Sequence, residues 1–367
     1  APGFAYLTSP DWPFDVPRLD VPRTRVPAGS VGLAGVFTGA YPRETPGGWR
    51  LIGRTSAPLF APDAAAPVLL APGTTVRFDP ARGSVSSAPG GPTAPGRAVA
   101  SGRPALRIDE PGLLATVQDL GRPGRAHLGI AGSGALDRGA LRTANRLVGN
   151  AQDAAAIEIT LGGFRATATA DGWFALAGAW GRIRLDDREV DPYQAHRWHA
   201  GEQLHVDWFD HGARAYLALR GGIAAPVSVG SRATDVMSGV GPAPLRAGDE
   251  VGTGDASAGP IPPVDVSPWG APHDDLLEIA LEPGPRADWF PASSRAALFD
   301  AVWTVTGDAD RVGIRLDGPV LERHRTGELP SEGMTPGALQ VPPGGRPTIL
   351  MADGPVTGGY PVIAVAT

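Results

Sequence analysis

The chain has 367 residues with a formal net charge of −6, and each of its 32 basic residues is arginine. With 42% hydrophobic and only 19% charged residues, it is too apolar for a disordered chain. The negative charge argues against a nucleic-acid partner. The absence of lysine excludes a Walker-A lysine, a Schiff base and biotin attachment on this chain. The absence of cysteine excludes thiolate chemistry.

Glycine (51) and proline (39) are together about a quarter of the chain. In an apolar sequence they predict a mainly β protein of short strands joined by turns, with few helices. The bias towards Ala, Arg, Gly and Pro, together with the absence of lysine, is explained most simply by a GC-rich genome. No apolar run approaches about 18 residues, so we expect no membrane-spanning helix. The first residues also lack the basic start and apolar core of a signal peptide.

Two segments have the composition of linkers. Residues 82–103 and 252–273 are rich in Gly, Pro, Ser and Ala and carry few bulky apolar side chains. They divide the chain into domains at 1–81, 104–251 and 274–367.

The blocks between the linkers show short apolar runs and two helical patterns. In the first block we predict strands at 30–37, 49–55 and 67–78. In the middle block, Asp137 leads into a helix at 140–150 with Leu141, Ala144, Leu147 and Val148 on one face. Predicted strands follow at 156–163, 164–169, 173–180, 182–187, 202–209 and 214–222. The last block has strands at 276–284, 311–318, 338–344 and 347–354, and a helix at 293–303 capped by Ser293 or Ser294.

The densest group of chemically useful residues lies at 117–137. This segment holds Gln118, Asp119, Arg122, His127, Ser133 and Asp137 among five glycines, which include Gly121 and Gly124. Glycine backbone N–H groups cradle anions, arginine binds phosphate or carboxylate, and histidine is a base near neutral pH. The alternative is structural: Asp119 and Ser133 stabilise turns, and Arg122 lies on a solvated face.

Two further segments are candidates. Gly47 and Gly48 form a turn that places Trp49 and Arg50 at the start of a strand, with Arg54 further along it. This arrangement fits a hairpin that binds a ligand, or a hairpin whose Trp49 lies in the core. The glycine-rich stretch 352–360 holds Asp353, Thr357, Gly358, Gly359 and Tyr360.

Four histidines lie close together in the sequence, at positions 196, 199, 205 and 211. Their spacing matches no common metal motif, so we expect surface histidines rather than a metal site. No GxSxG sequence supports a serine nucleophile.

Long motifs resemble a known pair of proteins. Residues 1–78, with VPRTRVPAGSVGLAGVFTGAYPRETPGGWRLIGRT, resemble the C-terminal half of the 5-oxoprolinase B subunit, the KipI or allophanate hydrolase subunit 1 family. Residues 105–367, with VQDLGRPGRAHLGIAGSGALDRGALRTANRLVGN and SEGMTPGALQVPPGGRPTILMADGPVTGGYP, resemble the C subunit, the KipA or allophanate hydrolase subunit 2 family. The chain is therefore similar to a B–C fusion.

The resemblance implies cyclophilin-like β-barrels: a C-terminal barrel part at 1–81 and two KipA-like domains at 104–251 and 274–367. Relative to the family, both ends are expected to be incomplete, with the B subunit's ferredoxin-like N-terminal part as a possible separate partner. The loop before Leu245 lacks an arginine that the family pattern has. The resemblance also implies a ligand site between the B-like and C-like parts, which brings 47–54 near 118–137.

The resemblance leaves three functions open. The first is a cytoplasmic, ATP-hydrolysing 5-oxoprolinase component, a hydrolase acting on a cyclic amide with ATP and Mg²⁺ as co-substrates. Its partner would be the A subunit, a protein of the LamB/YcsF family. The second is the carboxyltransferase module of a urea-carboxylase-like enzyme, with biotin carried elsewhere. The third is a regulator of a sensor kinase. A homo-oligomer is also possible.

For the first function, we hypothesise catalytic roles for Asp119, Arg122 and His127 from the chemistry of their side chains. Arg50, Arg54 and Arg122 are candidates to hold phosphate, and Asp119 or His127 to handle protons or magnesium. The remaining candidates bind substrate or ATP: Gly47, Gly48, Trp49, Gln118, Gly121, Gly124, Ser133, Asp137, Thr357, Gly358, Gly359 and Tyr360.

Overall fold

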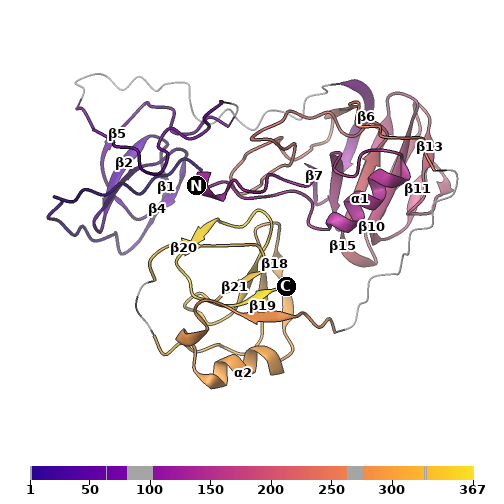
Figure 1. Cartoon of the computed structure of the whole chain (residues 1–367). Coiled ribbons are helices and arrows are strands. Elements are labelled where there is room, and N and C mark those ends of the chain that lie inside the picture. The colour runs from indigo at the N-terminus through magenta and orange to yellow at the C-terminus, as the bar shows by residue number, and fades with distance from the viewer. Residues whose placement is uncertain (1, 63, 81–101, 263–275, 326, 328) are drawn as a thin grey trace. The chain divides into compact units, whose positions relative to one another are not determined.

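The computed structural model describes residues 2–62, 64–80, 102–262, 276–325, 327 and 329–367. The chain forms two compact units (Figure 1). The first holds Ala1–Pro95 and Gly124–Ile130, and the second holds Gly96–Pro123 and Ala131–Thr367. Each unit is described separately below.

The first unit is built from short strands around an aromatic core. Its elements are β1 (Arg23–Val26), β2 (Ser30–Ala34), β3 (Phe37–Ala40), β4 (Thr45–Gly47), β5 (Arg50–Arg54) and the 3₁₀ turn η1 (Ala126–Leu128). The sheets are antiparallel, with the orders β3-β2-β5 and β1-β4. Val26, Ala34, Tyr41 and Trp49 form the core, and Phe4 packs against it.

The second unit begins with a β-sandwich, formed by residues 102–123 and 131–262. Its strands are β6 (Arg103–Pro111), β7 (Leu114–Gln118), β8 (Ala156–Thr160), β9 (Phe164–Ala168), β10 (Gly172–Trp180), β11 (Ile183–Leu185), β12 (Arg188–Glu189), β13 (His196–Trp198), β14 (Gln203–Val206), β15 (His211–Leu219) and β16 (Glu250–Thr253). They form a five-stranded sheet, β13-β10-β15-β8-β7, and a six-stranded sheet, β12-β11-β14-β9-β6-β16. Side chains from both sheets share one core.

Helix α1 (Arg138–Leu147) covers the outer face of the five-stranded sheet (Figure 1). Leu141, Ala144 and Leu147 pack there against alanines of β10 and β15 and against Tyr216. The middle strands of this sheet are thus buried on both faces, which explains the continuous apolar runs of β8 and β10.

The C-terminal region of this unit, residues 276–367, adds another sheet. Its elements are β17 (Leu281–Pro283), η2 (Ala287–Trp289), α2 (Ala292–Asp300), β18 (Thr304–Ala309), β19 (Gly313–Asp317), β20 (Glu332–Gly333), β21 (Ala338–Gln340), β22 (Thr348–Leu350), β23 (Thr357–Gly358) and β24 (Val362–Ala366). The six-stranded sheet has the order β17-β24-β21-β22-β19-β18, and β20 pairs with β23.

The prediction of a mainly β chain with few helices is confirmed. The expected closed barrels are not formed by the described strands, because each sheet ends in two unpaired edges. The helix predicted at 140–150 is α1, and Asp137 caps it by accepting a hydrogen bond from Ala140 N at 2.8 Å. No helix among the described residues is long and apolar enough to cross a bilayer.

Two local predictions differ from the structure. Residues 67–78 form no strand beyond a bridge between Val68 and Phe60, since Pro67, Pro72 and Gly73 interrupt any ladder. Helix α2 follows Pro291 and has no side-chain cap. The predicted capping residue Ser294 instead donates its hydroxyl to Glu322 O.

The predicted linkers are shorter than expected. Residue 103 already belongs to β6, and 252–253 belong to β16. Ser257 bridges Asn150, and the N–H groups of Ala258 and Gly259 both donate to Gly149 O. Residues 252–259 are therefore anchored to the sandwich by hydrogen bonds, while 82–101 and 263–273 lie outside the described residues.

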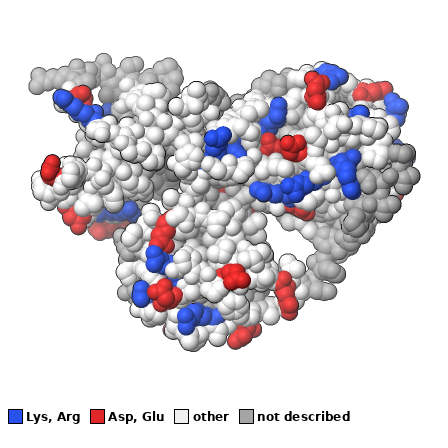
Figure 2. Space-filling view, viewed as in Figure 1, with Lys and Arg blue, Asp and Glu red and all other residues white. Residues whose placement is uncertain are grey.

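Charged side chains on the face shown in Figure 2 are mixed in sign rather than gathered into one patch. Elsewhere in the described residues, exposed charges form local pairs such as Arg346 with Asp317, which are both more than half exposed. Exposed pairs of this kind contribute little to stability. The second unit also holds a group of fully buried charges, which lies next to the candidate site.

Candidate functional site

The loop after β7 is shaped by Asp119 and Gly121. Asp119 Oδ1 accepts hydrogen bonds from Gly121 N at 2.8 Å and Ser231 Oγ at 2.6 Å, and Oδ2 accepts one from Arg232 N at 2.7 Å. Gly121 has φ +81°, and a Cβ there would lie 2.5 Å from Gly132 O. Asp119 therefore stabilises the turn, as in the structural alternative, and its role with protons or magnesium stays a prediction.

Arg122 is buried, with only 2% of its surface exposed, which overturns the solvated-face alternative. Its backbone N–H donates to Gly132 O at 2.7 Å, and its Nη2 donates to Ala233 O. Nε and Nη1 have no hydrogen-bond partner among the described residues. Burial lowers the pKa of Arg122, although the nearby charges of Asp235 and two further carboxylates oppose this.

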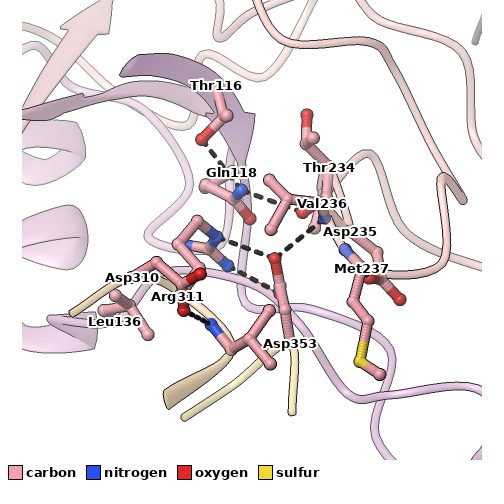
Figure 3. A network of polar contacts seen from close by, with 12 residues as sticks. Thr116, Gln118, Leu136, Thr234, Asp235, Val236, Met237, Asp310, Arg311 and Asp353 are labelled. Carbon is pink, nitrogen blue, oxygen red and sulfur yellow. Dashed lines mark hydrogen bonds and ion pairs between the residues drawn. The ribbon is translucent and has the colours of Figure 1, made fainter. Parts of the chain in front are cut away.

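Three more buried side chains near Arg122 have an unpaired polar atom among the described residues. These atoms are Gln118 Oε1, Ser133 Oγ and Thr234 Oγ1. Gln118 is held by its amide nitrogen, which donates to Thr116 Oγ1 and to Thr234 O, both at 3.0 Å (Figure 3). We call Gln118, Arg122, Ser133 and Thr234 the Arg122 cluster. Each unpaired buried group costs about 1–3 kcal/mol, so an added polar partner would stabilise the cluster.

A small cavity borders the backbone that holds the Arg122 cluster. Gly132 and Ala352 are among its lining residues, and it measures about 20 Å³. Gly132 O accepts from Arg122 N, and Ala352 O accepts from Ser133 N at 3.0 Å. A buried water needs roughly 10–15 Å³, so this cavity accepts a water and not a ring-shaped substrate.

The first unit holds a far larger cavity of about 780 Å³. This lies within the range of roughly 300–1,000 Å³ typical of small-molecule sites. Aromatic and hydroxyl side chains line it, including Tyr6, Trp12, Phe78 and Thr38. We call it the aromatic cavity.

His127 lines the aromatic cavity. Its Nδ1 lies 3.0 Å from Gly124 O. Because a carbonyl oxygen can only accept, Nδ1 carries the hydrogen, and in the neutral ring Nε2 keeps its lone pair. His127 is exposed and lies on the wall of a substrate-sized cavity, and its role as a base stays a prediction.

The other predicted residues of the first unit lie elsewhere. Trp49 is buried in the aromatic core, with its ring 5.2 Å from that of Phe4, as the core-hairpin alternative predicts. A Cβ at Gly47 would come within 2.6 Å of Tyr41 Oη, so Gly47 permits close packing. Gly48 O accepts from Leu19 N. Arg50 and Arg54 are exposed on β5. Gly124 has φ +78°, a left-handed backbone conformation that favours glycine.

In the second unit, Ser133 has φ +50° and belongs to the Arg122 cluster, whereas Asp137 is occupied as the cap of α1. Thr357 and Gly358 form β23, followed by Gly359 and a partly exposed Tyr360. The structure thus brings Gln118, Asp119, Gly121, Arg122 and Ser133 together. A cleft joining 47–54 with 118–137 stays a prediction.

Sequence reasoning missed Glu158 and Arg311 of the buried network and named Asp353 only as part of the candidate stretch 352–360; each of the three is 1% exposed or less. One sequence feature could have identified Glu158 as a buried charge: it is the single charged residue of the mostly apolar segment AIEIT. The four histidines make separate contacts, such as His196 Nε2 with Asp191 O. In the described ranges no group of three or more His, Asp or Glu side chains is placed to hold a metal.

Comparison with known families gives two matches along the chain. A profile of the carboxyltransferase domain, subdomains A and B, matches residues 128–367, and a profile of subdomains C and D matches residues 1–70. The solved structure of TTHA0988 is 38% identical, with a TM-score of 0.84, covering 100% of this chain and 72% of that one.

Three curated relatives show the same division. The 5-oxoprolinase C subunit of Escherichia coli is 40% identical over 264 residues, covering 71% of this chain and 83% of that protein. The 5-oxoprolinase B subunit of Bacillus subtilis is 50% identical over 78 residues, covering 21% of this chain and 32% of that protein. The urea amidolyase of Lachancea kluyveri is 32% identical over 287 residues, covering 71% of this chain and 16% of that protein.

Proposed function

Because this chain belongs to the carboxyltransferase domain family, we propose that it serves as the joined B and C components of a 5-oxoprolinase complex. The observation that carries the proposal is the order of the matches: a segment similar to the B component is followed, in one chain, by a segment similar to the C component. In this proposal the chain binds and activates 5-oxoproline with ATP and Mg²⁺ as co-substrates. Ring opening to glutamate is completed by the A component, a separate protein of the LamB/YcsF type.

The chemistry requires an activated lactam, since an amide carbonyl is a poor electrophile. The lactam oxygen attacks the γ-phosphorus of ATP and ADP leaves. Water then adds to the activated carbon, and the ring C–N bond breaks as its nitrogen takes a proton, which leaves an acyl phosphate. A second water attacks the acyl carbon and releases phosphate. The overall products are glutamate, ADP and phosphate.

The aromatic cavity and the burial of Arg122 support a division of roles. The aromatic cavity, at about 780 Å³, has room for the substrate, and His127 Nε2 can accept a proton there. Arg122, in contrast, is buried with only 2% of its surface exposed, so direct contact with phosphate requires the segments packed around it to move.

The test is a coupled assay with the full chain, the A component, ATP and 5-oxoproline, in which ADP and glutamate are both measured. We expect ADP release that depends on 5-oxoproline. His127→Ala should lower the rate by about 10²–10⁴-fold, as loss of a general base does. His199→Ala is the matched control, because the His199 side chain is exposed and pairs with Asp171 outside the aromatic cavity. The proposal is overturned if ADP release does not depend on 5-oxoproline, either with or without the A component.

A second candidate is carboxyl transfer, favoured by the family profiles and by the urea amidolyase relative. A chain without lysine would receive biotin from another domain or protein. Transfer of a carboxyl group from a carboxylated biotin carrier to urea, without ATP-dependent lactam opening, would favour this alternative.

A further inference from the structure

Arg311 is a fully buried residue that ties the C-terminal region to the sandwich (Figure 3). It lies in the turn between β18 and β19, with 0% of its side chain exposed. Nη1 donates to Glu158 Oε1 at 2.6 Å, Nε donates to Asp353 Oδ2 at 2.9 Å, and Nη2 donates to Asp353 Oδ1 at 3.0 Å. Nη2 also donates to Gly134 O at 2.7 Å.

The partners of Arg311 in turn hold the loops of the sandwich. Asp353 Oδ2 accepts from Val236 N at 3.0 Å. Glu158 Oε2 accepts from Leu136 N at 3.2 Å and from Tyr216 Oη at 2.6 Å. One guanidinium therefore fixes the segments 134–136 and 234–237, directly or through one carboxylate.

These segments form the base of the loop that carries His127. The chain leaves the second unit at Pro123 and returns at Ala131. The two ends of this loop are joined by the hydrogen bond from Arg122 N to Gly132 O at 2.7 Å. Gly134, two residues beyond that bond, is the residue whose carbonyl Arg311 holds.

The cost of burying this network argues that its geometry matters. Buried ion pairs are often no more stabilising than apolar side chains of the same volume. Arginine presents a planar fork of five directed donors, which lysine cannot reproduce. Burial lowers the pKa of Arg311, but Glu158 and Asp353 outweigh it and hold the pKa above its ordinary value, so the fork stays charged.

We infer that Arg311 is a positioning residue, which sets the base of the His127 loop from the C-terminal region without touching substrate. This inference rests on the proposed function, because His127 is the base in that reaction. It gives the C-terminal region a defined task in the chemistry of a cavity that it does not line.

The test combines Arg311→Lys with His127→Ala in the complete complex. Lysine keeps the charge beside Glu158 and Asp353 but cannot make all four hydrogen bonds. Because misplacement by about 1 Å can cost 10²-fold in rate, we expect Arg311→Lys to lower kcat by about 10–100-fold at a temperature where the variant is still folded. In the His127→Ala background the same change should lower kcat by less than about 2-fold. Equal losses in both backgrounds, or full activity of Arg311→Lys, would overturn the inference.

Hydrogen exchange gives a second, activity-independent readout. Arg311→Lys should speed exchange at the amides of 133–136 and 234–236 while leaving those of 203–206 in β14 unchanged. Arg315→Lys is the matched control, since Arg315 lies on β19 and its side chain donates an exposed hydrogen bond to Asp308 O. Unchanged exchange at 133–136 would refute the positioning role. If the wild-type complex shows no lactam-dependent turnover, the proposed function fails, and exchange still decides the role of Arg311.

Discussion

Replacing Asp353 by Asn perturbs a fully buried charge pair of the second unit. Asp353 is fully buried and accepts three hydrogen bonds, two from Arg311 at 2.9 and 3.0 Å and one from Val236 N at 3.0 Å. Asparagine turns one acceptor oxygen into a donor that faces the donors of Arg311. The guanidinium then keeps Glu158 as its only carboxylate partner. Removing one partner of a buried ion pair lowers the free energy of unfolding by about 3–5 kcal/mol.

The matched control is Asp317→Asn. Asp317 pairs with Arg346 at 3.0 Å, but the two side chains are 58% and 61% exposed. Exposed pairs contribute about 0.2–1 kcal/mol. Urea unfolding, followed by tryptophan fluorescence and circular dichroism, gives the free energy of unfolding for both variants. Losses that agree within about 1 kcal/mol would refute the claim that burial makes the Arg311–Asp353 pair critical. The double variant Arg311→Met/Asp353→Asn should lose less than the sum of the two single losses.

Three further substitutions test other parts of the account. Trp49→Ala should destabilise the first unit by about 3–5 kcal/mol in urea unfolding, because Trp49 lies in its core. An unchanged urea midpoint would contradict this position of Trp49. Asp137→Ala should cost about 1 kcal/mol in thermal unfolding, since it removes the cap of α1; no loss would contradict the capping role. Burial, then the charge of Asp353, raises the pKa of Asp235 above its ordinary 3.8, so the folded state holds that proton more tightly than the unfolded one. Stability therefore falls as pH rises above that value, and Asp235→Asn should gain on wild type between about pH 4 and pH 7; a difference that does not vary with pH would refute the shift.

Local patterns were enough to predict much of the fold. The spacing of Leu141, Ala144 and Leu147, with Asp137 before them, identifies α1 and its buried face. The apolar runs at 156–163 and 173–180 identify β8 and β10 because both faces of their sheet are covered. The prediction of a strand at 67–78 is wrong, since the apolar residues of this run line a cavity instead of pairing with a strand.

The candidate site was only partly predictable. The segment 117–137 contains His127 and most of the Arg122 cluster, because glycine, arginine and histidine gather there in sequence. Burial of Arg122 and Trp49 depends on tertiary packing, which the local sequence does not reveal. The partners of Arg311 lie 42 and 153 residues away along the chain, so no local pattern joins them.

The most direct test of the central claim is ATP turnover by the full chain with the A component. The account predicts ADP and glutamate formed in equal amounts, dependent on 5-oxoproline, and largely lost in His127→Ala but retained in His199→Ala. Carboxyl transfer from a biotin carrier without lactam-dependent ADP release would contradict it.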